Sequence, residues 1–303
     1  MAEILTKALS FVMIIFMGNA LRRTGFFKEE DFYVLSKIVL KITLPAAIIS
    51  NFSGTTLKPS MLVITLMGLG GGILLILVTY LLTAKKDRKE RAFHVLNVAG
   101  YNIGNFTMPF AQSFLGSTGV IVTSLFDTGN SFICLGGSYS IASMIQDKNG
   151  KFSITRILKT LVKSIPFDTY LIMTVLTLCQ ITLPKPVVSL ANIIGGSNAF
   201  LAMLMMGVGL KLSGEKSQRK SIIRILSIRY SISIALALVF YFLLPFPLEY
   251  RQALTILSLS PIASAAPAFT ADLKGDIGLA SAVNSLSIVI SIFLITMALL
   301  LIL

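Results

Sequence analysis

Ala99-Gly-Tyr-Asn-Ile-Gly-Asn-Phe-Thr-Met-Pro109 in one half of the chain, and Ser258-Leu-Ser-Pro-Ile-Ala-Ser-Ala-Ala-Pro267 in the other, decide the fold. Each stretch lies inside a long apolar segment, yet carries proline, glycine and polar residues that a membrane helix usually avoids. Proline lacks a backbone N–H and clashes with the preceding turn, so each helix is predicted to be interrupted near its middle. Paired interruptions in corresponding places of two halves are the best sequence sign of a transporter's binding site.

The composition around these stretches is that of an all-α integral membrane protein. Hydrophobic residues make up 55% of the chain, charged residues 13%, and the mean hydropathy is +0.85. The polar connections are too short to form a core, so residues 1–303 are predicted to form a single membrane domain. No cluster of Cys, His, Asp or Glu has the spacing of metal ligands, and no nucleotide-binding or hydrolase motif occurs. We therefore expect no metal, no cofactor and no enzymatic activity.

Apolar runs long enough to cross about 30 Å of hydrocarbon predict ten spans. Their approximate ranges are 4–21, 34–52, 61–83, 93–115, 119–145, 164–182, 187–210, 222–244, 252–272 and 277–302. The first run has no cleavage site of small residues followed by a soluble domain, so it is predicted to be a spanning helix rather than a removable signal. The two interrupted stretches fall in the fourth and ninth of these spans.

Basic residues are concentrated on one side of the predicted membrane. Of the 26 Lys and Arg, all but Lys7, Lys58, Lys185 and Arg251 fall in the odd-numbered connections or, like Lys37, Lys41 and Arg229, near the same helix ends. Cytoplasmic connections carry the excess of positive charge, so this pattern predicts that both termini lie outside. The net charge of +13 is then explained by topology and by membrane lipid, and it requires no nucleic-acid partner.

Ten spans divide into two groups of five, and because five is odd, the groups must have opposite orientations. A faint internal repeat agrees with this division at a nearly constant offset: Phe52-Ser-Gly54 aligns with Leu212-Ser-Gly214, Gly116-Ser-Thr-Gly-Val120 with Gly275-Asp-Ile-Gly-Leu279, and Pro109 with Pro267. The sequence therefore predicts two inverted five-helix repeats, residues 1–147 and 148–303, whose broken fourth and ninth helices cross.

The broken segments also carry the candidate binding groups. Tyr101, Asn102, Asn105 and Thr107 place amide and hydroxyl groups where the first helix exposes free backbone groups. The second segment offers Ser264 and other serines around Pro261 and Pro267, with small alanines that leave room. Half-helix N-termini meeting at mid-membrane attract anions such as carboxylates. The alternative interpretation is that Pro and Gly merely kink spanning helices, in which they are frequent.

A few polar residues lie inside the other predicted spans. Asp127 is an isolated acid in the fifth span, and because a buried carboxylate is costly, it is either a proton-coupling group or a structural hydrogen-bonding group. Lys41 either reaches the inner headgroups or attracts an anionic substrate. The asparagines of the remaining spans more often hold helices together than bind a ligand; they are Asn51, Asn130, Asn198 and Asn284.

Short motifs give the chain a resemblance to a known family. Tyr101-Asn102 followed by Gly-Asn-Phe-Thr-Met-Pro109 resembles the fourth helix of the auxin efflux carrier family, whose bacterial members include malate and malonate permeases. Phe126-Asp-Thr-Gly-Asn130 is similar to the family's fifth-helix motif, and Leu44-Pro45 to its second-helix motif. The likeness covers the whole chain in length and number of spans.

The resemblance implies a fold related to the bile acid/sodium symporters, with spans one, two, six and seven as scaffold and the rest as a domain that moves as an elevator. It also implies a homodimer in the cell membrane. The resemblance assigns the substrate site to residues on both crossing segments, namely Asn102, Asn105, Pro109, Pro261, Ser264 and Pro267, beside Tyr101 of the same motif. The family's long cytoplasmic loop of plant members is absent from this sequence.

Together these features predict a secondary transporter of small organic anions, with carboxylates as the expected substrates, that works by alternating access. Proton coupling through Asp127 and uncoupled uniport both remain open. The first alternative is a sodium-coupled symporter of larger amphipathic anions, which needs dense oxygen ligands beside the crossing. An intramembrane aspartic protease, which needs two facing Asp, and a receptor or scaffold that transports nothing are the others.

Overall fold

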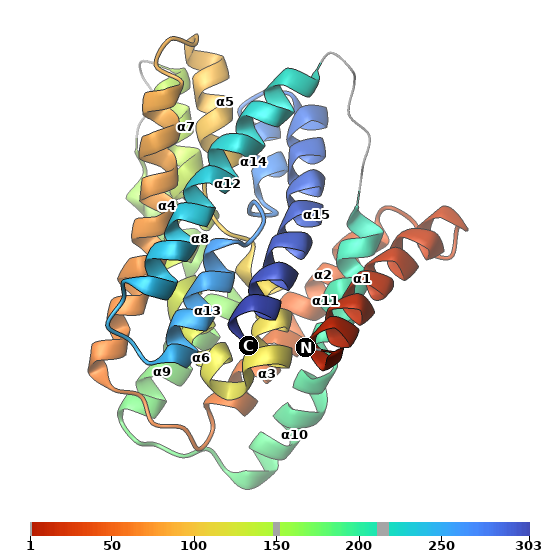
Figure 1. Ribbon diagram of the computed structural model, residues 1–303, viewed down its shortest axis with the longest axis vertical. Coiled ribbons are helices and arrows are strands. Elements are labelled where there is room, and N and C mark those ends of the chain that lie inside the picture. Colours follow the sequence, from red (N-terminus) through yellow and green to blue (C-terminus); the bar gives the residue numbers. More distant parts are fainter. Residues whose placement is uncertain (1, 148–151, 211–217) are drawn as a thin grey trace.

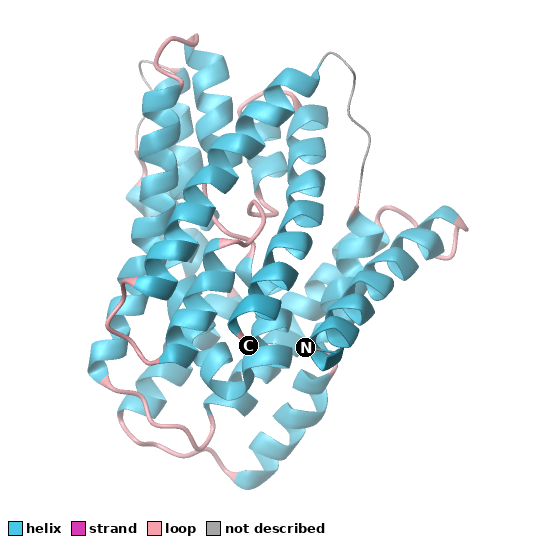
Figure 2. Cartoon of the chain, viewed as in Figure 1, coloured by secondary structure: helices cyan, strands magenta, loops and turns pink. Residues whose placement is uncertain are grey.

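The computed structural model describes residues 2–147, 152–210 and 218–303, and all the regular structure in these ranges is helical (Figures 1 and 2). Two predictions lie outside these ranges. One is the cytoplasmic placement of Lys148, Lys151, Lys211 and Lys216, and the other is the Leu212-Ser-Gly214 part of the internal repeat.

The first half of the chain contains seven α-helices and four shorter turns of π- or 3₁₀-helix. In order they are α1 (Ala2–Arg23), α2 (Asp31–Ile38), η1 (Val39–Thr43), α3 (Leu44–Phe52), η2 (Pro59–Leu62), α4 (Val63–Leu82), α5 (Arg88–Val98), η3 (Ile103–Thr107), α6 (Met108–Phe132), η4 (Ile133–Gly137) and α7 (Ser138–Gln146). The second half continues with α8 (Ile154–Leu161), α9 (Ile165–Leu178), α10 (Lys185–Gly196), α11 (Asn198–Gly209), α12 (Arg219–Phe242), α13 (Leu248–Ser258), α14 (Ala266–Asp272) and α15 (Ile277–Ile302).

By length and apolar composition, seven helices of the described residues can cross a membrane, or eight if the bent pair α8 and α9 forms one span. Apolar side chains cover the outer faces of these helices, for example Phe16, Leu82 and Leu301, as expected for contact with lipid. A multi-pass membrane protein is therefore confirmed, whereas the finer prediction of ten spans stays a prediction.

The run Arg88–Gln146 is counted as one of the seven, although it is too long for a single crossing. Its 59 residues would extend roughly 90 Å as a straight helix, about three times the hydrocarbon thickness. Gly116 inside α6 has φ 59° and ψ −151°, which no helix contains. The chain doubles back there, because α5 at the start of the run packs against α7 at its end (Figure 1).

The densest helix packing falls into two sets, and α6 connects them through contacts with α3, α9 and α11. In one set α1 packs on α11, and α3 packs on α9 and α10. In the other, α4 packs on α6, α5 on α7, and α12 on α13. Both sets use glycine for close approach: Gly68 and Gly129 bring the α4 and α6 backbones together, and Gly18 and Gly207 do the same for α1 and α11.

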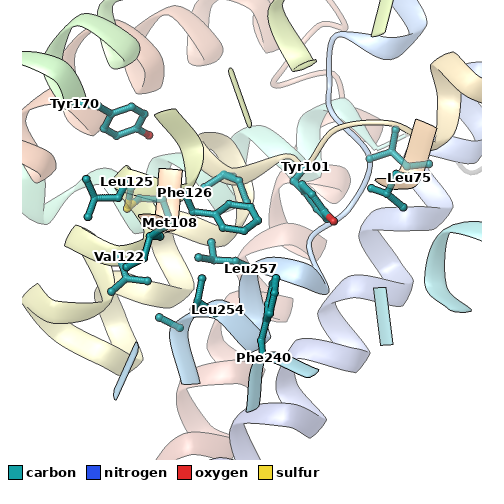
Figure 3. Packing of buried hydrophobic residues seen from close by; sticks show 14 of the residues in the cluster. Leu75, Tyr101, Met108, Val122, Leu125, Phe126, Tyr170, Phe240, Leu254 and Leu257 are labelled. Atoms are coloured by element: carbon teal, nitrogen blue, oxygen red, sulfur yellow. The ribbon is translucent and has the colours of Figure 1, made fainter. Parts of the chain in front are cut away.

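A large apolar cluster joins the two halves of the chain behind the broken segments. Tyr101 and Phe126 contact each other edge to face, with ring centroids 5.6 Å apart. Figure 3 shows these two rings near Leu257 of α13, with Leu254 close by. Because residues of both broken segments and of α6 share this cluster, it fixes the positions of the segments relative to each other.

Candidate functional site

The first helix interruption comes before Pro109, not at it. Helix α5 ends at Val98, and residues 99–102 are non-helical, with Gly100 at a φ of 75° that favours glycine. The π-helical turn η3 then leads directly into α6, where Pro109 is the second residue. Proline is well tolerated in a first turn, where its missing N–H has no partner to lose. The prediction of a break was thus correct, but its place is several residues upstream.

The second interruption is longer. Helix α13 ends at Ser258 and α14 begins at Ala266, so residues 259–265 are non-helical. Pro261 lies within the break, whereas Pro267 is the second residue of α14, in the same position as Pro109 in α6. We call residues 99–102 the first break and residues 259–265 the second break.

The two breaks contact each other directly. The backbone N–H of Asn102 donates to the carbonyl oxygen of Pro261 at 2.9 Å. The amide nitrogen of Asn105, in η3, donates to the Ser264 hydroxyl at 3.3 Å. The hydroxyls of Thr107 and Ser260 lie 2.6 Å apart. Residues more than 150 positions apart in the sequence therefore meet where both helices are unwound.

An asparagine from a helix further along the chain holds the backbone of each break. Asn130 of α6 accepts from the Tyr101 N–H at 3.0 Å and donates to the Tyr101 carbonyl at 2.8 Å. Asn284 of α15 donates to the carbonyls of Ile262 and Ala263 at 3.1 and 3.2 Å. Both asparagines thus satisfy backbone groups that unwinding leaves free, as the structural interpretation of these residues requires.

Arg229 of α12 joins the two breaks, which the sequence analysis missed. Its guanidinium donates to the carbonyls of Val98, the last residue of α5, and of Gly100 (2.6 Å) on the first break, and to those of Ser260 (2.9 Å) and Pro261 (3.1 Å) on the second. The side chain is completely buried. Counting Arg229 among the basic residues at cytoplasmic helix ends was therefore wrong, because it lies ten residues inside α12. A charged residue within an apolar run was the available signal.

A cavity of about 360 Å³ lies beside the breaks. Among the predicted binding residues, those that line it are Tyr101, Asn102, Asn105 and Ser264. Pro109, Pro261 and Pro267 do not line this cavity; Pro261 contributes through its carbonyl group, as a partner of Asn102 and Arg229.

Two buried amide atoms of cavity residues lack a hydrogen-bond partner in the described part of the chain, Asn102 Nδ2 and Asn105 Oδ1. Buried amide groups are normally satisfied, so such atoms call for a ligand or water. Lys41 of η1 and Lys163, just before α9, also line the cavity and are exposed. The lining of the cavity therefore combines amide hydrogen-bonding groups with two ammonium groups.

Asp127 lines the same cavity. One carboxylate oxygen accepts from the Asn130 amide at 2.8 Å, and the other from the Tyr170 hydroxyl at 3.0 Å. No ion pair of Asp127 is found within the described residues, and no other acidic residue lines the cavity. An aspartic protease needs two facing Asp side chains, and the lining of this cavity supplies one.

A cavity with a largely apolar lining and a few amide, hydroxyl and charged groups, placed where two interrupted helices meet in a multi-pass membrane protein, is typical of a membrane transport protein. The comparison of sequences agrees: the profile of the family described as "Membrane transport protein" matches residues 3–301. The chain therefore belongs to this family, the auxin efflux carrier family, as the resemblance indicated. A search of curated proteins finds no match.

Proposed function

We propose that the protein is a secondary transporter, a permease, of small organic anions, with carboxylates as the substrate class. The observation that carries the proposal is the cavity in which the amides of Asn102 and Asn105 face Ser264 of the other break. The unpaired Nδ2 of Asn102 is a donor for a carboxylate oxygen, and Lys41 and Lys163 supply positive charge. The volume suits a small molecule rather than a peptide.

The architecture we propose has ten spans in two inverted repeats, residues 1–147 and 148–303. Span four consists of α5, η3 and the part of α6 before Gly116, and span nine consists of α13 and α14. The two spans cross where the first break and η3 form hydrogen bonds with the second break. The turn at Gly116 supports a separate fourth and fifth span. Such crossed, discontinuous helices place substrate groups near the bilayer midplane.

We further propose elevator-type alternating access, in which the set containing α4 to α7 and α12 to α15 moves against the set containing α1, α3 and α9 to α11. The dense packing of α1 on α11 and of α3 on α10 in one set, and of α4 on α6 and α5 on α7 in the other, supports this division, and the contacts of α6 with α3, α9 and α11 form the surface along which the sets would move. In Figure 1 the loop between α1 and α2 lies well below the upper ends of α5 and α12. The charge pattern predicts that this loop and both helix ends lie on the cytoplasmic side of the membrane. An offset of this kind along the long axis is expected if one set of helices is displaced relative to the other.

The charge pattern supports a plasma-membrane protein with cytoplasmic odd-numbered connections and both termini outside. The homodimer that the resemblance implies belongs to the same proposal. Crosslinking in native membranes and accessibility of single cysteines placed in the connections test these two points.

The test of the site is transport by purified protein in proteoliposomes. A thermal-shift screen of mono- and dicarboxylates, malate and malonate among them, selects ligands, and counterflow with the hits measures exchange. Asn102→Ala and Asn105→Ala each remove a cavity amide, and we expect at least tenfold slower uptake with near-normal expression, a loss of more than about 1.4 kcal/mol of binding. Asn192→Ala, on the exposed face of α10, is the matched control and leaves uptake unchanged. Normal transport by both cavity variants contradicts the site assignment.

Proton coupling through Asp127 is the second part of the proposal. Asp127→Asn keeps the shape and can still accept from Tyr170, but it cannot exchange a proton. We expect uptake by this variant to lose its dependence on pH between about pH 5 and 8, while the wild type retains it. The same pH profile in both proteins removes Asp127 from the coupling mechanism and leaves uniport.

A further inference from the structure

Four carbonyl oxygens converge on one point between the two breaks. Two belong to the end of α5 and the first break, Val98 and Gly100, and two to the second break, Ser260 and Pro261. Unwound carbonyls and the C-terminal ends of half-helices are the groups that bind Na⁺ in transporters with broken helices. In this chain the point is filled by a guanidinium group.

The guanidinium of Arg229 is a permanent charge. Arginine keeps its proton in proteins, and the side chain is fully buried, with the ring of Tyr101 at 4.8 Å from its central carbon. No carboxylate forms an ion pair with it in the described residues. Its counter-charge is therefore supplied by the carbonyl dipoles and by the negative ends of α5 and α13.

We propose that Arg229 is a tethered cation that occupies the place of a dissociable coupling ion and makes this transporter independent of Na⁺. The guanidinium neutralises the carbonyl cluster and holds both breaks together, so no vacant oxygen site is left for a metal cation. It also leaves fixed positive charge directly behind Tyr101, which lines the cavity.

One consequence rests on the transport function proposed above. A cation that is part of the chain returns with the empty carrier, whereas a bound Na⁺ would be released with the substrate. Each cycle that is not coupled to protons then moves only the negative charge of the anion, so uptake responds to membrane potential but not to a Na⁺ gradient.

The test begins with the melting temperature of the purified full-length wild type in NaCl, KCl and choline chloride at equal ionic strength. We expect the same value in all three salts. A rise that is specific to Na⁺ overturns the proposal, because it shows that a vacant Na⁺ site exists. This measurement requires neither a substrate nor a variant.

The second arm empties the site. Arg229→Ala is expected to lower the melting temperature by on the order of 10 °C, and about 10 mM ethylguanidinium, too dilute to denature, is expected to restore a large part of the loss. Arg224→Ala, an exposed change on the same helix, is the control and gains nothing from ethylguanidinium. An Arg229→Ala protein that melts like the wild type, or that no cation restores, contradicts the proposal.

If Arg229→Ala does not fold, Arg229→Lys and Arg229→Gln replace it. Lysine keeps the charge and glutamine only the hydrogen-bond donors, so we expect the lysine variant to melt at the higher temperature, and equal values refute the tethered charge. All these readouts are independent of substrate. If the protein does not transport carboxylates, but its melting temperature is insensitive to Na⁺ and ethylguanidinium restores the Arg229→Ala variant, the proposed function alone is refuted. If it transports carboxylates normally, but Na⁺ raises its melting temperature, this inference alone is refuted.

Discussion

The two breaks occupy corresponding places but differ in composition and in the contacts that hold them. The first is short, and its Asn102 lines the cavity together with Asn105 of the η3 turn that follows it. The second is longer and is built of small residues, of which Ala263, Ser264 and Ala265 line the cavity. The comparison teaches that the first break supplies most of the polar groups, while the second supplies space and backbone carbonyls.

The side chains that hold the backbone of the two breaks also differ. One side chain, Asn130, binds both backbone groups of Tyr101 and a carboxylate oxygen of Asp127. The second break is held at several separate points by α15: besides Asn284, Ser287 accepts from the Ile262 N–H at 3.1 Å, and Ser291 donates to the Leu259 carbonyl at 2.7 Å. A support concentrated in one residue is more vulnerable to mutation than a distributed one.

The largest expected effect follows from this difference. Asn130→Ala leaves the buried Tyr101 N–H and one Asp127 carboxylate oxygen without their partner and removes one of the donors to the Tyr101 carbonyl, which keeps the Ile103 N–H; we expect a loss of roughly 3–5 kcal/mol in unfolding free energy. Asn284→Ala, the matching change at the second break, removes donors to two carbonyls from a half-buried side chain, and should cost roughly 2 kcal/mol. Denaturant melts of the two variants in the same detergent measure the difference. Equal losses would mean that the two supports are equivalent.

Gly100→Ala is expected to have an intermediate effect of about 2–3 kcal/mol. The backbone at Gly100 has a φ of 75°, and an added Cβ would lie 2.6 Å from the sulfur of Cys134 and 3.3 Å from the Cβ of Ala263 in the second break. Cys134→Ala in the same chain removes the closer obstacle, so the double variant should recover part of the loss in thermal melts. If the double variant is no more stable than Gly100→Ala, the contact with Cys134 is not the cause.

Ser291→Ala gives the smallest effect, about 1 kcal/mol. It removes the donor to the Leu259 carbonyl, whereas its other partner, the Tyr230 hydroxyl, still donates to the Ser287 carbonyl at 2.6 Å. A melting temperature lowered by only a few degrees, with unchanged carboxylate uptake, fits a distributed support. A loss as large as that of Asn130→Ala shows instead that one serine carries the second break.

The sequence alone located both breaks, because proline and glycine disrupt helices through local stereochemistry. It did not fix the boundaries of the breaks within the stretches 99–109 and 258–267: Pro109 and Pro267 lie in the first turn of a helix, where proline is favoured, and so mark where each helix resumes. It also identified Tyr101, Asn102, Asn105 and Ser264 as candidates, and these residues do line one cavity. Their role in substrate binding stays a prediction.

What local patterns do not contain is which distant groups meet. Arg229 was assigned to a helix end because its position near other basic residues fits topology, yet tertiary packing directs it to carbonyls of two other helices. Asp127 has one local and one distant partner: Asn130 is three residues away in the sequence, whereas Tyr170 comes from α9. The family, by contrast, was visible in the short motifs and is confirmed by the match over residues 3–301.

The glycine contacts between α4 and α6 have a mechanical consequence. A Cβ at Gly68 would meet the backbone oxygen of Phe126, and one at Gly129 would meet that of Thr65, so the two helices touch main chain to main chain. At these two points no side chain lies between the helices, so no change of rotamer there lets one helix slide along the other. Asp127 and Asn130, which line the cavity, lie on α6 as well. Any shift of these residues relative to α3 therefore moves α4 together with α6 as one rigid unit.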